Sequence, residues 1–105
     1  MIDHDPGGAL SKLAMKLDAE EGVLFGKPCL KIAGKAFVAA FKGSVVFKLA
    51  ADDREKALSL RGSALWDPSG KKRPMKEWVV VTPAHESKWL ALARRARSFV
   101  SGTAV

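Results

Sequence analysis

Cysteine occurs once in this chain and histidine twice, while asparagine and glutamine do not occur at all. A single cysteine excludes an intrachain disulfide and a thiolate metal cluster built within one chain. Asn and Gln are among the side chains that read base edges in nucleic acids, so any contact with DNA is expected to be independent of base sequence.

Long apolar runs are also missing. The longest uninterrupted run, residues 36–41, is far shorter than the roughly 20 residues that a membrane-spanning helix needs. The first residues, MIDHDPGG, are acidic and have no apolar core of the kind found in secretory signals. We therefore predict a cytoplasmic protein that does not contact the membrane.

Basic residues are abundant and unevenly distributed. The 105 residues, a length typical of one domain, carry 18 basic and 11 acidic side chains and a net charge of +7. Residues 22–51 contain five lysines and no acid. Such a surface favours acidic partners or polyanions, while by itself it predicts nothing about the fold.

Residues 22–51 contain three short apolar runs separated by turns at Gly34-Lys35 and Lys42-Gly43-Ser44, a pattern that predicts a β-meander. Alternation along the runs predicts one bulky face of the sheet, with Leu30, Ile32, Phe37, Ala39, Phe41, Val45, Phe47 and Leu49. The opposite face is expected to present small apolar residues, Ala36, Val38, Ala40 and Val46, rimmed by Lys31, Lys42 and Lys48. Small apolar side chains gathered on a sheet predict a covered surface, either under a helix of this chain or under another molecule.

Helical spacing predicts a first helix over residues 9–17, after a mobile start at residues 1–8 and before an end at Gly22. Asp52 and Glu55 have the spacing of a capping box, which predicts a short helix from Asp52 to Leu60. These two helices would flank the meander.

The second half of the chain adds two strands and a helix. We predict strands at residues 64–66 and 77–82, an exposed loop at residues 67–75, and a C-terminal helix at residues 83–100 that Thr82 and Pro83 begin. The predicted fold is a single small α+β domain, residues 1–105, in which an antiparallel sheet (the β-meander plus a later strand) has its bulky face packed by N- and C-terminal helices.

Residues able to catalyse a reaction are few. His4 lies in the predicted mobile start and His85 in the first turn of the last helix, and neither lies near a recognisable nucleophile motif. Cys29 with His85 is the one combination that the sequence leaves open. No cofactor or metal motif is found, and none is expected.

Two groups of residues are candidate binding sites. The first is cationic and could contact phosphate groups: Lys71, Lys72 and Arg73 in the predicted loop, with Arg94, Arg95 and Arg97 on the last helix. The second is the small-residue face of the sheet, where Ala36, Val38, Ala40 and Val46 could pair with a second copy across a two-fold axis.

Three motifs carry a family resemblance: FGKPCLKIAGKAFVAAFKGSVVFKL, then GKKRPMKEWVVV, then the tryptophan-bearing WLALARRARSFV. Together they resemble the TfoX N-terminal-domain family and, more distantly, the YjbR (MmcQ) family, over about residues 23–100. The matching positions are Phe25, Gly26, Gly34, Phe37, Phe47, Lys48, Arg73 and Met75. The resemblance implies a compact α+β domain similar in arrangement to secretion chaperones, with no catalytic residues in its pattern.

TfoX relatives include regulators of bacterial DNA-uptake competence, and YjbR-like proteins are presumed to bind DNA. The resemblance, with the missing catalytic motif, predicts a non-enzymatic, regulatory or adaptor-like protein-binding module that could also self-associate. The alternatives are a weak, sequence-nonspecific DNA-binding protein and a small enzyme that uses His85 or Cys29.

Overall fold

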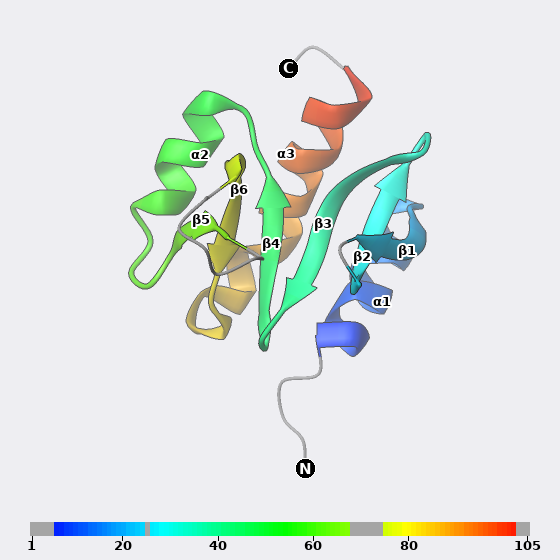
Figure 1. The fold of residues 1–105 in the computed structure, drawn as a ribbon, viewed down its shortest axis with the longest axis horizontal. Helices are drawn as coiled ribbons and strands as arrows, with labels where there is room; N and C mark the ends of the chain where they lie inside the picture. The colour runs from blue at the N-terminus through cyan, green and yellow to red at the C-terminus, as the bar shows by residue number, and fades with distance from the viewer. Residues whose placement is uncertain (1–5, 25, 68–74, 103–105) are drawn as a thin grey trace.

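A computed structural model of the chain describes residues 6–24, 26–67 and 75–102. Over these residues it contains one six-stranded antiparallel sheet, three α-helices and one 3-10 helix (Figure 1). The helices are α1 (Pro6–Leu17), α2 (Ala51–Leu58), η1 (Pro83–Lys88) and α3 (Trp89–Ser101). The strands are β1 (Glu20–Leu24), β2 (Lys27–Ile32), β3 (Lys35–Phe41), β4 (Ser44–Lys48), β5 (Ala64–Trp66) and β6 (Met75–Val81).

The strands are ordered β1-β2-β3-β4-β6-β5, and all neighbours are antiparallel. The first four form the meander, and β6 enters between β4 and the edge strand β5 after the chain has passed through α2. This arrangement confirms the predicted α+β class. None of the helices in the described ranges is long and apolar enough to cross a membrane.

Two hairpin turns set the ends of the strands in the meander. Ala33 and Gly34 have φ of 52° and 80°, and Lys42 and Gly43 have φ of 49° and 83°. A two-residue turn with positive φ at both positions matches the right-handed twist of the strands that it joins. The first turn therefore lies at Ala33-Gly34, one residue earlier than predicted.

The meander has a fourth strand, β1, that the sequence analysis did not predict. Gly22 lies inside β1 opposite Cys29, so the prediction that Gly22 ends the first helix is wrong. The helix ends at Leu17, and Asp18 reverses the chain with a φ of 54°. A Cβ at Gly22 would lie 3.1 Å from the Cε atom of Lys31, whose flexible side chain would have to shift by a few tenths of an ångström.

Helix α1 also begins earlier than predicted, at Pro6, where a proline ring is tolerated because the first turn has no intrahelical partner for its N–H. Residues 6–8, which the sequence analysis assigned to a mobile start, are therefore helical. Residues 1–5 lie outside the described part of the chain.

A β-bulge interrupts the alternation in β3. Leu30 of β2 pairs with Val38, whereas the following residue, Lys31, pairs with Ala36. Phe37 is thus an extra residue in β3, and Phe37 and Val38 together oppose Leu30. Both side chains lie in the same core cluster as Leu30, on the side of the sheet that the helices cover, which we call the helix face.

The bulge shifts the alternation by one residue, so the predicted division of β3 between the two faces is wrong beyond Phe37. Val38 and Ala40 belong to the helix face, while Ala39 and Phe41 belong to the opposite side, which we call the outer face. The rest of the bulky-face prediction is confirmed: Leu30, Ile32, Phe37, Val45, Phe47 and Leu49 all pack on the helix face.

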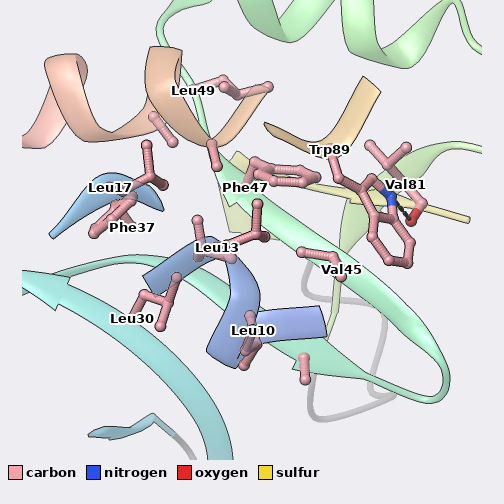
Figure 2. Packing of buried hydrophobic residues seen from close by; sticks show 14 of the residues in the cluster. Leu10, Leu13, Leu17, Leu30, Phe37, Val45, Phe47, Leu49, Val81 and Trp89 are labelled. Carbon is pink, nitrogen blue, oxygen red and sulfur yellow. Dashed lines mark hydrogen bonds between the residues drawn. The ribbon is translucent and has the colours of Figure 1, made fainter. Parts of the chain in front are cut away.

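All three α-helices contribute to the core on the helix face (Figures 1 and 2). Leu10, Leu13 and Leu17 of α1 meet Leu30 and Phe37, as Figure 2 shows. The α3 residues of this core are Trp89, Ala93, Ala96 and Val100, and Ala57 is the buried residue of α2. The buried indole Nε1 of Trp89 donates a hydrogen bond of 3.3 Å to the carbonyl oxygen of Val81, which satisfies its polar atom.

The outer face has its own, smaller cluster of buried residues. Its members are Cys29, Ala39, Val46, Trp66 and Trp78, with Leu24, Ala36, Phe41 and Val80 partly buried against them. The Trp66 ring lies 5.4 Å from that of Trp78 and 5.8 Å from that of Phe41, centroid to centroid, in tilted and edge-on geometries. Aromatic rings therefore bury the outer face near β6, where none of the helices in the described ranges contributes a buried residue.

Two predicted helix starts differ from those observed. Helix α2 has Ala50 as its N-cap and no side-chain cap, so Asp52 and Glu55 do not form the predicted capping box. Asp52 and Asp53 instead lie in the first turn, where carboxylates stabilise the positive end of the helix dipole. The predicted helix at residues 83–100 is divided into η1, which is kinked at the non-helical torsions of His85, and α3, which begins at Trp89.

The face assignment of Val38 predicts how two valine-to-glutamate substitutions differ. Val38→Glu buries a carboxylate in the apolar core and should lower the free energy of unfolding by at least about 4 kcal/mol. Val23→Glu, at a β1 residue that is 65% exposed, should change it by less than about 0.5 kcal/mol. Urea unfolding measures both, and equal midpoints for the two variants would place Val38 on the surface.

Candidate functional site: the groove between α2 and α3

Helices α2 and α3 leave a groove of about 440 Å³ between them. One wall consists of Asp53, Lys56 and Ala57 of α2 and of Leu60, just beyond the end of that helix. Its other wall consists of Lys88, at the end of η1, with Ala91, Leu92 and Arg95 of α3. The groove is thus lined by four apolar and four charged residues.

Both walls follow the same helical spacing. Each contains residues i, i+3, i+4 and i+7, which lie along one face of a helix. In each wall the i+3 or i+4 position holds an alanine, Ala57 in α2 and Ala91 in α3. Because alanine is short, facing alanines do not fill the space between two helices, and a hollow remains.

An ion pair connects the two walls. The Nε atom of Arg95 donates to Oδ2 of Asp53 at 3.0 Å, between residues 42 positions apart in the chain. The Asp53 side chain is 13% exposed and that of Arg95 is 46% exposed. The pair holds the first turn of α2 beside α3 and keeps the guanidinium oriented. As a partly exposed pair, it should contribute at most about 1 kcal/mol to stability.

The groove carries more positive than negative charge. Lys56, Lys88 and Arg95 face one carboxylate, that of Asp53. Among the described residues, neither lysine forms an ion pair. Arg95 uses only its Nε atom for Asp53, and its other nitrogens make no hydrogen bond to a described residue. The site therefore offers an apolar floor with unpaired donors beside it.

The structure separates the arginines that the sequence analysis grouped together. Arg95 lines the groove, whereas Arg94 and Arg97 do not; as an i, i+3 pair, these two lie next to each other on another face of α3. Arg94 is exposed, and Arg97 is partly buried with an Nε atom that has no hydrogen-bond partner among the described residues. The predicted loop cations Lys71, Lys72 and Arg73 lie outside the described part of the chain.

The predicted small-residue surface does not exist as one face. The bulge places Val38 and Ala40 under the helices, while Val46 and Ala36 lie on the outer face. Val38, Ala40 and Val46 are buried, and Ala36 is partly buried. These four residues therefore cannot form the predicted interface with a second copy, because three of them are already covered within one chain.

Three lysines contact neighbouring side chains, and two of them, Lys42 and Lys48, are among the predicted rim residues. The ammonium groups of Lys27 and Lys42 lie 5.5 Å and 5.2 Å from the centroid of the Phe41 ring, in cation–π geometry. Lys48 is 3.8 Å from the carboxylate of Glu77. These contacts account for three of the lysines as partners of neighbouring side chains.

Cys29 and His85 do not form a catalytic pair. Cys29 lies in β2, and His85 follows β6, which is separated from β2 by two strands and hence by roughly 14 Å. The Nε2 atom of His85 is 2.9 Å from the carbonyl oxygen of Arg61. Burial raises the pKa of the Cys29 thiol, and the charge of Lys31 and a hydrogen bond to the Gly22 backbone oppose that effect. Burial and a raised pKa both make this thiol a poor nucleophile.

The sequence analysis did not predict the groove, although its signal is visible in the repeated spacing of residues 53, 56, 57, 60 and 88, 91, 92, 95. Spacing alone does not reveal that the two sets face each other. Comparison of the chain with protein-family models, with curated proteins and with solved structures found no match.

The burial of Cys29 predicts slow modification by a thiol reagent. Cys29 is 1% exposed, so a disulfide reagent such as DTNB should reach it only through opening of the sheet, at least about a hundredfold more slowly than an exposed thiol. The control is a Cys29→Ala, Ala64→Cys variant, which moves the thiol to an exposed alanine of β5. Equal rates at pH 8 would show that Cys29 is accessible and would restore the enzyme alternative.

Proposed function

We propose that this chain is a non-enzymatic binding domain, regulatory or adaptor-like, that holds a segment of a protein partner in the groove between α2 and α3. The observation that carries the proposal is the combination of an apolar floor with unpaired donors in one open groove. Protein-binding grooves need apolar surface for affinity and polar groups for orientation. Here both are available without any change in the fold.

The dimensions of the groove support a peptide segment as the occupant. Lys88 and Arg95 lie two helical turns apart, a distance of about 10 Å along the axis. About three residues of an extended chain cover that length. A short linear segment of a partner, rather than a whole folded surface, therefore fits the groove.

Other features agree with a regulatory role inside the cell. The resemblance to the TfoX N-terminal-domain family supports a regulatory function, and membership of that family is part of our proposal. A single buried thiol, Cys29, suits the reducing cytoplasm, where we place the protein. The proposed role requires no cofactor.

Weak, sequence-nonspecific DNA binding is the second candidate function. The net charge of +7 and the exposed side chain of Arg94 favour it. The partial burial of Arg97 weakens this candidate, because it leaves fewer arginines of α3 accessible to a phosphate backbone.

Filling the groove should abolish the proposed binding. Peptides selected from a random display library on the intact protein should bind the purified protein, and Ala91→Trp should weaken their binding at least tenfold, because the indole would occupy the groove. Ala64→Trp, at an exposed alanine outside the groove, is the matched control. Circular dichroism checks that both variants are folded. Failure to select any peptide, or equal weakening by both variants, would contradict the proposal.

Salt dependence tests the DNA alternative. If Lys71, Lys72 and Arg73 contact phosphates, replacing all three with alanine should reduce the log–log salt slope of duplex binding by about 2.7, at about 0.9 per phosphate. Titration of a labelled duplex at low salt, followed by fluorescence anisotropy, gives the slope. No binding at tens of micromolar protein would eliminate this function.

A further inference from the structure

We infer that the groove between α2 and α3 selects an acidic segment, in which two carboxylates flank one apolar side chain. This inference rests on the proposed function, since it specifies the partner that the groove accepts. It is carried by the charges and positions of the groove residues within 53–60 and 88–95.

Charge complementarity indicates that the segment bound in the groove is negatively charged. The groove holds the cationic groups of Lys56, Lys88 and Arg95 against the single carboxylate of Asp53. Among the described residues the ammonium groups of both lysines are without an ion-pair partner. An acidic segment would supply the missing countercharges, whereas a basic one would meet three like charges.

Arg95 is prepared to bind a carboxylate. Asp53 accepts a hydrogen bond from Nε, and this contact fixes the plane of the guanidinium while both Nη groups keep their donors for another partner. A guanidinium presents parallel N–H groups that match the two oxygens of a carboxylate. With 46% of the Arg95 side chain exposed, this edge is accessible from solvent. Asp53 therefore acts as a positioning residue that orients Arg95.

The distance between Lys88 and Arg95 determines how far apart two acidic residues of the bound segment must be. Lys88 and Arg95 lie about 10 Å apart along the α3 axis. In an extended segment of polyproline-II twist, residues three apart lie on the same side and about 9 Å from each other. Carboxylates at positions 1 and 4 of such a segment would meet Lys88 and Arg95, and Lys56 lies on the opposite wall.

The apolar floor between the cations favours an apolar residue between the two acidic residues of the segment. Ala57, Leu60, Ala91 and Leu92 form the apolar part of the groove. An apolar side chain at position 2 or 3 of the segment would lose its contact with water there. The same floor favours an apolar side chain over a nucleic-acid backbone, whose charged phosphates cannot fill it.

The test uses fluorescein-labelled 12-residue peptides that carry a Glu-Ala-Leu-Glu core between glycine and serine residues. Fluorescence anisotropy of the intact protein should show at least fivefold weaker binding for two changed cores, Gln-Ala-Leu-Gln and Glu-Ala-Ser-Glu. The first change removes the charges and the second removes the apolar side chain. Binding that does not distinguish the three cores overturns the inference, while the groove can still hold other peptides.

Neighbouring arginines give a matched pair of variants. Arg95→Gln and Arg94→Gln remove the same charge from adjacent, exposed positions of α3, but only Arg95 lines the groove. Arg95→Gln should weaken the Glu-Ala-Leu-Glu peptide at least fivefold and Arg94→Gln less than twofold, with Lys88→Gln behaving like Arg95→Gln. Equal weakening by both arginine variants would indicate nonspecific attraction to net charge and would overturn the inference.

The outcome for this inference can be separated from that for the proposed function. If display-selected peptides bind and Ala91→Trp releases them but none is acidic, the groove is a protein-binding site and the acidic specificity is wrong. If neither selected nor designed peptides bind, both proposals fail. If duplex DNA binds and is weakened equally by Arg94→Gln and Arg95→Gln, a phosphate-binding surface replaces the peptide groove.

Discussion

Two consecutive side chains of β3, Phe37 and Val38, enter the core opposite the single residue Leu30, and the packing of α1 and α3 depends on this bulge. A regular strand would turn one of the two away from the helices. With the bulge, the middle of the sheet presents a broad apolar surface that the helices can cover. The bulge also moves Ala39 and Phe41 to the outer face, where the Phe41 ring meets Trp66.

The position of the groove follows from the topology beyond the meander. Strand β6 lies between β4 and β5, so the connection through α2 places that helix on the helix face beside α3. Only Ala57 of α2 is buried, and α2 is joined to α3 by the ion pair of Asp53 and Arg95. Unfilled space remains between this short helix and α3, and this space is the candidate binding site.

Local patterns in the sequence predicted the meander, the strands near residues 64–66 and 77–82, and the α+β class, because alternation and glycine turns are properties of short segments. They could not predict the bulge at Phe37, which depends on the register with β2 and makes simple alternation misplace Val38 and Ala40. The groove was also missed, since it requires residues near 53 and 95 to meet across 42 positions. The sequence also could not show that Arg95 lines the groove while Arg94 and Arg97 lie on another face of α3, because that depends on where α2 packs.

The central claim is that the surface between α2 and α3 is where a partner segment binds. The most direct measurement is the set of backbone amide shifts that change when the ¹⁵N-labelled protein is titrated with a Glu-Ala-Leu-Glu peptide. The account predicts that the largest changes fall on Asp53, Lys56, Ala57, Lys88, Ala91 and Arg95. Changes concentrated on the outer face around Lys27, Phe41 and Lys42, with none in the groove, would contradict it.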